Sequence, residues 1–287
     1  MFLQQLVNGV VIGSVYALTA MGATLVYGIL RVLDIANAGA YVIGAYIGMT
    51  IYALTGNLFA SLVATLIVSG LIGVGLERFI YLRLFNKSPV ILLITSIGIF
   101  IFIEDLLRLL NGPYAKRFPA KLPFDGVQLA NLSIPGTWIL VMVVTAVLLF
   151  VLWYILYHTK IGLAWRATAQ DIEIAKAMGI NVNLIVALNF FLGYGFAAVA
   201  GSLIGIMYNS ISPTMGDIPA YKMLAIIVLG GLGNPVGTVI AALVIGLVET
   251  FIGGYIGFFF PRDAIAFVAL IILLLIRPKG LFASKNI

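Results

Sequence analysis

The sequence has 287 residues, of which 63% are hydrophobic and 9% are charged, with a mean hydropathy of +1.18. Average soluble domains carry about 25% charged residues, so this composition excludes a soluble enzyme. The formal net charge is +6, and the basic residues behind it lie in short polar breaks. We interpret them as a membrane-topology signal instead of a nucleic-acid site. The sequence has no cysteine and a single histidine, His158, which excludes a disulfide framework and a multi-histidine metal centre.

Long apolar runs separated by short polar breaks predict an all-α, polytopic helix bundle in the lipid bilayer. One crossing takes about 20 apolar residues, so residues 1–287 have room for about eight to ten transmembrane helices in a single domain. The first run starts near Met1 without a basic segment or cleavage site, and it is interpreted as a membrane helix. The runs are 6–30, 37–55, 58–76, 89–110, 137–157, 184–208, 221–233, 237–256 and 263–276.

Glycine pairs spaced four residues apart recur in these runs. Such residues lie on one helix face, where two glycines let helix backbones approach closely. The pattern predicts tight packing in a compact bundle. The pairs are Gly9 and Gly13, Gly44 and Gly48, Gly201 and Gly205, and Gly253 and Gly257.

The break between the first two runs reads Arg31-Val-Leu-Asp-Ile-Ala-Asn-Ala-Gly39. Asp34 and Asn37 are polar residues between two apolar helices, where buried polar groups are expensive. A structural kink and the edge of a cavity would each explain them.

Charged residues inside the apolar runs are few, and each is a candidate functional residue. Glu104 and Arg108 are one helical turn apart near the end of the fourth run, and we expect them to form an ion pair. Glu249 lies well inside the eighth run and has no partner nearby in the sequence. It must therefore face the bundle, a cavity or another subunit.

The region 221–256 has a glycine-rich centre, Gly230-Gly-Leu-Gly-Asn-Pro-Val-Gly237. The apolar run before this centre is too short to cross a bilayer alone. A broken helix or a re-entrant pair, buried against protein, is one interpretation, and two full crossings are the other.

Basic residues are concentrated in alternate breaks, namely 77–88, 158–183 and the tail from Arg277. The positive-inside rule places these segments in the cytoplasm, together with the C-terminus, and it places the N-terminus outside. The break 111–136 is an exception, because it is basic and falls on the outer side.

The cytoplasmic segment 158–183 predicts a short amphipathic helix of about eight residues. Asp171 and Glu173 suit its start and Gly179 suits its end. Ala175 and Gly179 lie on its apolar face. The polar face is poor in Lys and Arg, so docking on a cytoplasmic partner explains the helix better than adhesion to a membrane surface.

Five motifs follow one another along nearly the whole chain. They are Asn8-Gly-Val-Val-Ile-Gly-Ser-Val-Tyr-Ala-Leu18, Gly22-Ala-Thr-Leu-Val-Tyr-Gly28, Gly162-Leu-Ala-Trp-Arg-Ala167 with Ala175-x-x-x-Gly-Ile180, Gly230-Gly-Leu-Gly-Asn-Pro-x-Gly237, and Arg277-Pro-x-Gly-Leu-Phe282. In this order they resemble the inner-membrane permeases of bacterial branched-chain amino acid ABC transporters.

The resemblance implies a non-enzymatic, cofactor-free subunit that translocates branched-chain or related amino acids. Its partners would be a second, homologous permease, two cytoplasmic ABC ATPase subunits and a periplasmic solute-binding protein. The segment 158–183 would be the loop that couples the permease to an ATPase. The implied ATPase-contact residues are Gly162, Arg166, Asp171, Glu173, Ala175, Gly179 and Ile180, and the pathway candidates are Asp34, Asn37, Tyr41 and Glu249.

Family members usually read Asn-Phe-Ala-His-Gly-Glu after the first span, whereas this chain reads Asp34-Ile-Ala-Asn-Ala-Gly39. If that turn edges the pathway, the substrate preference is expected to differ, and other amino acids or urea stay open.

Two other classes of function are alternatives to the permease. An autonomous ion-coupled carrier or channel needs carboxylates near the membrane midplane or a selectivity ring, and Glu249 is its one strong candidate. A membrane-embedded enzyme needs a nucleophile with a base or a metal cluster, and the sequence offers neither. The sequence has no P-loop motif, so ATP would have to be bound by a partner.

Overall fold

Helices dominate the computed structural model, and seven of them are long and apolar enough to cross a membrane. The one sheet in the described part of the chain is an antiparallel hairpin in which Val127 lies opposite Ile134. The prediction of an all-α, polytopic bundle is confirmed. The structure describes residues 2–85, 87–120, 122, 126–129, 132–255, 268 and 271.

The seven candidate spans agree closely with seven of the predicted runs, and several begin at a polar N-cap. Asn57 accepts hydrogen bonds from two backbone N–H groups at the start of α3, and Ser88 caps α5 immediately before Pro89. The third span continues from α3 through a π-helical turn, η1 (Glu77–Tyr81), into α4 (Leu82–Leu84). The other bounds are α1 (Phe2–Leu30), α2 (Ala36–Thr55), α3 (Leu58–Leu76), α5 (Pro89–Asn111), α6 (Gly136–His158), α9 (Val182–Tyr208), α11 (Pro235–Tyr255), β1 (Gly126–Leu129) and β2 (Leu132–Pro135).

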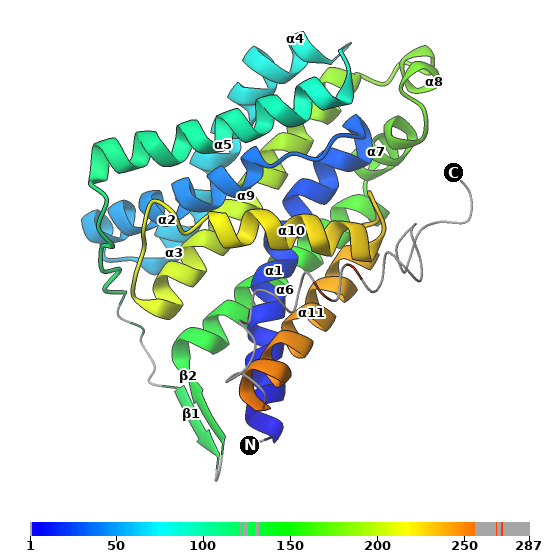
Figure 1. The fold of residues 1–287 in the computed structure, drawn as a ribbon. Coiled ribbons are helices and arrows are strands. Elements are labelled where there is room, and N and C mark those ends of the chain that lie inside the picture. Colours follow the sequence, from blue (N-terminus) through cyan, green and yellow to red (C-terminus); the bar gives the residue numbers. More distant parts are fainter. Residues whose placement is uncertain are drawn as a thin grey trace.

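Helices α1 and α9 form the centre of the bundle and are its most deeply buried spans. Helix α1 packs along α11 and α9, and α9 also packs against α2 and α3 (Figure 1). A Cβ atom added at Gly13 would lie 2.9 Å from the Leu243 Cα, so α1 and α11 touch through their backbones. The predicted close packing through glycine is therefore confirmed for this pair of helices.

The contact between α2 and α9 is closer still. A Cβ atom at Gly44 would overlap the backbone of Ala198, and one at Gly201 would overlap the backbone of Tyr41. The hydroxyl of Ser202 also donates a hydrogen bond of 2.8 Å to the Gly44 carbonyl. Of the four glycine pairs predicted from the sequence, only one residue, Gly257, lies outside the described residues.

The region 221–256 is a broken helix. Helix α10 (Asp217–Gly230) has 14 residues, about 21 Å at the usual rise, and is too short for a hydrocarbon core of about 30 Å. Gly231 and Gly233 then adopt φ values of +93° and +78°, which favour glycine, and α11 starts at Pro235. In Figure 1, α10 (yellow) runs at a steep angle to α11 (orange). The last predicted run, 263–276, lies outside the described residues, apart from the helical residues Val268 and Ile271.

Two short helices, α7 (Lys160–Gln170) and α8 (Ile172–Ala177), follow α6 at one end of the molecule, and the hairpin lies at the other end (Figure 1). The side chain of Gln4 exchanges two hydrogen bonds with the backbone of Ser133, so the start of α1 is tied to the hairpin. The bundle therefore presents two different ends, and the segment expected in the cytoplasm occupies one of them.

Replacing Gly44 by alanine is expected to separate α2 from α9, because the new methyl group would overlap the backbone of Ala198. Overpacking of this kind costs about 1–3 kcal/mol. We expect the purified protein to aggregate at a lower temperature in a detergent thermostability assay. Gly98→Ala on α5 is the matched control, because a Cβ there meets nothing within 4 Å. Equal thermal stability of the two variants would contradict the close contact.

Candidate functional site

Asp34 pins together three parts of the bundle. Its carboxylate accepts hydrogen bonds from the hydroxyls of Tyr81 (2.6 Å) and Tyr194 (2.9 Å) and from the backbone N–H of Ala36 (3.1 Å). Burial raises the pKa of the Asp34 carboxyl to about 6, against the three hydrogen bonds, which lower it. Asp34 therefore joins η1, α9 and the start of α2 through buried hydrogen bonds.

Asn37 and Tyr41 are buried one and two turns further along α2. The Asn37 side-chain amide has no hydrogen-bond partner among the described residues, and it lies against Gly22 of α1, near Gly193 of α9. Tyr41 is 3% exposed, and its backbone faces Gly201 of α9. Both residues therefore lie at helix contacts in the core.

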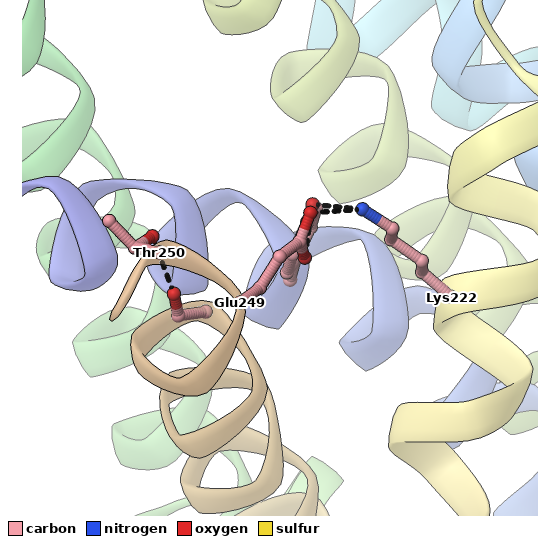
Figure 2. Close-up of polar contacts among 5 residues, drawn as sticks. Lys222, Glu249 and Thr250 are labelled. Carbon is pink, nitrogen blue, oxygen red and sulfur yellow. Dashed lines mark hydrogen bonds and ion pairs between the residues drawn. The ribbon is translucent and has the colours of Figure 1, made fainter. Parts of the chain in front are cut away.

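Glu249 is held in a buried ion pair. Its carboxylate lies 2.7 Å from the Lys222 ammonium and also accepts a hydrogen bond of 3.1 Å from the Tyr16 hydroxyl. Lys222 donates a further hydrogen bond of 2.6 Å to the same hydroxyl, and its ammonium lies 4.9 Å from the centre of the Tyr16 ring. Figure 2 shows Lys222 reaching from α10 towards Glu249 on α11. Of the alternatives for Glu249, the structure shows that it faces the bundle.

The predicted ion pair between Glu104 and Arg108 is wrong. Arg108 instead contacts Asp105 at 2.9 Å, where both side chains are exposed. Glu104 is buried and 8% exposed, and one of its carboxylate oxygens has no hydrogen-bond partner among the described residues. On a helix, Arg108 can reach a partner either three or four residues earlier in the chain. Because Glu104 is buried, Arg108 pairs with Asp105 instead.

The segment 158–183 forms two helices, whereas the sequence predicted one. The eleven-residue helix α7 was missed, and α8 has six residues instead of about eight. Asp171 caps α8 by accepting hydrogen bonds from the N–H groups of Glu173 and Ile174, and Gly179 closes it with a φ of +82°. The start and end signals were therefore interpreted correctly.

The apolar side chains of α8 and its C-cap are partly buried against this chain and partly exposed. Ala175 is 2% exposed and packs inward, and Ile180 donates a backbone hydrogen bond to its carbonyl. Ile174 and Met178 are 63% and 78% exposed. The outward surface of α8 therefore carries two large apolar side chains beside the charged residue Glu173.

The remaining coupling candidates lie on α7. Gly162 is buried where a Cβ would overlap the backbone of Leu156 on α6, and Arg166 lies over the Tyr157 ring at 5.4 Å. Both residues hold α7 in place against α6.

Trp165 connects α7 to the core, a role that sequence reasoning missed. Its indole N–H donates a hydrogen bond of 2.7 Å to the Asn189 side chain on α9, and Asn189 donates one of 2.8 Å to the Leu25 carbonyl on α1. Lys222 was also missed as the partner of Glu249. A tryptophan and a lysine in apolar segments were the available signals, but neither reveals its distant partner.

The fold and these sites define a polytopic membrane protein whose polar groups are embedded in a helix bundle. Among the described residues, no three His, Cys, Asp or Glu side chains gather in a group that could hold a metal ion. In the part of the chain that the structure describes, the arrangement offers one buried ion pair, and it has an exposed helical surface at one end.

The chain is similar to known proteins over its whole length. The family described as "Branched-chain amino acid transport system / permease component" matches residues 5–277. The high-affinity branched-chain amino acid transport system permease BraD of Pseudomonas aeruginosa is 35% identical, covering 100% of this chain and 97% of the relative. The corresponding permease LivH of Escherichia coli K12 is 33% identical over the same shares. The chain therefore belongs to this family of transport permeases.

One solved structure shares the fold. The complex PsaBC of Streptococcus pneumoniae with a Fab matches with a TM-score of 0.51 at 16% identity, covering 97% of this chain and 92% of the matched chain. At this identity the likeness supports the fold alone.

Replacing Tyr81 by phenylalanine is expected to lower the stability of the protein by about 1.5–3 kcal/mol, the usual contribution of a hydrogen bond to a charged group. The lost hydroxyl donates to the buried Asp34 carboxylate, which retains two other donors. Thermal unfolding in detergent measures the change. Tyr154→Phe, which alters an exposed tyrosine of α6, is the control and should unfold as the wild type does.

Proposed function

We propose that this chain is the transmembrane permease subunit of a binding-protein-dependent ABC importer that carries branched-chain amino acids across the bacterial inner membrane. The observation that supports it most directly is the family match over residues 5–277, together with full-length similarity to BraD and LivH. The ion-coupled carrier is not favoured, because Glu249, its strongest candidate residue, is neutralised by Lys222. Related amino acids and urea stay as alternative substrates.

The complete transporter would contain a second, homologous permease, two cytoplasmic ABC ATPases and a periplasmic solute-binding protein. The chain has no P-loop, so the energy must come from the ATPases. The printed names of the relatives describe permease proteins of a transport system, which supports such an assembly.

Helix α8 is the proposed contact with an ATPase. Its exposed residues Glu173, Ile174 and Met178 suit a helix that docks in an apolar groove with a polar rim. Of the coupling residues, Asp171, Gly179 and Ile180 shape α8 at its two ends, and Gly162 and Arg166 fix α7 against α6. Motion of α8 would reach α9 and α1 through Trp165 and Asn189.

The pathway candidates lie in different environments and would have different roles. Asn37, whose amide is buried without a described partner, is the best-placed residue of the α2 group to contact a polar solute when the helices separate. Asp34 and Tyr41 would position that part of α2. Glu249 lies apart from them on α11, in the ion pair with Lys222.

Purification from native membranes in mild detergent tests the proposed function. We expect ATPase subunits and a second permease to copurify with the chain, and ATP hydrolysis in the eluate to rise when a leucine-loaded binding protein is added. A chain that purifies alone and moves solute in liposomes without ATP would overturn the proposal.

The proposed orientation places the N-terminus outside and α8 in the cytoplasm. The chain has no cysteine, so a single introduced cysteine is its only thiol that can react with a labelling reagent. We expect Lys87→Cys, in another break placed in the cytoplasm, to react with an impermeant maleimide in inside-out vesicles and Tyr114→Cys to react in right-side-out vesicles, because both positions are exposed. The opposite pattern would reverse the orientation.

Replacing Glu173 by lysine should uncouple ATP hydrolysis from transport without unfolding the protein, because Glu173 is exposed on the proposed docking surface of α8. We expect a loss of leucine uptake of roughly tenfold, the effect of about 1.4 kcal/mol at the contact. Uptake and ATP hydrolysis are measured together in proteoliposomes. Asp105→Lys applies the same charge reversal to an exposed residue of α5 and should leave uptake unchanged. Normal uptake by the Glu173 variant would remove α8 from the coupling contact.

A further inference from the structure

Lys222 and Glu249 are an unusual pair for a membrane bundle. Their side chains are only 4% and 6% exposed, and their charged atoms lie 2.7 Å apart. Among the residues that the structure describes, Lys222 is the one buried cation. Replacing a buried ion pair by apolar residues is often neutral or stabilising, so stability alone is a weak reason to keep charges here. Ionisable groups inside a membrane protein are by default candidates for a pathway.

The pair joins two helices on opposite sides of the glycine-rich turn. Tyr16 and Glu249 lie on α1 and α11, whose backbones touch at Gly13 and Gly246. Lys222 lies on the half-helix α10, which is separated from α11 by the turn at Gly231 and Gly233. Movement of α10 would therefore open the ion pair and leave Tyr16 with Glu249. Discontinuous helices of this kind supply substrate sites in other transporters.

The three side chains match the two charges of a free amino acid. The carboxylate and ammonium groups of an α-amino acid are attached to the same carbon, so their partners must lie close together. Lys222 supplies a cation, and Glu249 supplies an anion beside it. The Tyr16 hydroxyl accepts from Lys222 and donates to Glu249, so it can bond to either charged group of a ligand.

We propose that Lys222, Glu249 and Tyr16 form a transient recognition site for the zwitterionic head of the transported amino acid. In the closed arrangement the two protein charges neutralise each other. When α10 moves, the substrate carboxylate takes the place of Glu249 at Lys222, and the substrate ammonium takes the place of Lys222 at Glu249. Lys222 and Glu249 then each face an opposite charge before and after the exchange. This inference rests on the proposed function and adds a site for the substrate head group.

The test uses the complete transporter in proteoliposomes and follows uptake of radiolabelled leucine. The variant Tyr16→Phe/Lys222→Met/Glu249→Leu replaces the three polar side chains of the site together by apolar ones, so none of the three is left facing a lost partner. We expect the complex to assemble and its binding-protein-stimulated ATP hydrolysis to persist. Uptake should fall by roughly ten- to hundredfold, the factor for losing a hydrogen bond to a charged group. Asp105→Leu/Arg108→Met removes an exposed ion pair in the same way and should leave uptake unchanged.

A second variant tests the same site if the first variant fails to assemble. The exchange Lys222→Glu/Glu249→Lys preserves an ion pair but reverses its direction. A packing role predicts normal uptake, whereas recognition of a zwitterion in one orientation predicts a loss of roughly tenfold or more. Lys222→Arg, which keeps the charge, should retain most of the uptake.

The outcomes separate this inference from the proposed function. Uptake at the wild-type level by the apolar variant or by the exchanged variant would overturn the recognition site and leave the importer standing. Failure of the wild-type complex to import leucine would overturn the proposed substrate, and with it the site.

Discussion

Direct contact between helix backbones is the constraint on which this bundle depends. Lipid chains are as apolar as leucine, so burial from water does not hold helices together inside a bilayer, and close packing with interhelical hydrogen bonds must do so. Gly44 and Gly201 bring α2 against α9, and Gly13 and Gly246 bring α1 against α11. Because α1 also contacts α9, these contacts form one continuous frame through the molecule.

Buried hydrogen bonds then hold the helices of that frame in fixed relative positions. Asp34 is bonded by tyrosines from two other segments, and Asn189 links Trp165 on α7 to the backbone of α1. Each of these groups would be costly if its partners moved away, because no water is available in the bilayer to replace them. They therefore fix the relative positions of helices that are distant in the sequence.

The two proposed moving parts, α8 and α10, are each connected to the frame by named contacts. Helix α8 is connected through α7 and Trp165, and it exposes large apolar side chains at one end of the molecule. Helix α10 is connected through a glycine-rich turn and the ion pair of Lys222. Under the proposed function, force applied by an ATPase at α8 would alter the proposed solute route at α10.

The sequence by itself left open whether the region 221–256 is broken, but it determined the membrane bundle, seven of its spans, the start and end of α8, and the family resemblance. These follow from local properties, namely apolar run length, helix caps and glycine positions. Only the tertiary structure decided that Glu249 pairs with Lys222, that Arg108 contacts Asp105 instead of Glu104, and that Ala175 packs inward. The division has one physical cause. A span or a cap depends on neighbouring residues, whereas the partner of a buried charge depends on which helix faces meet.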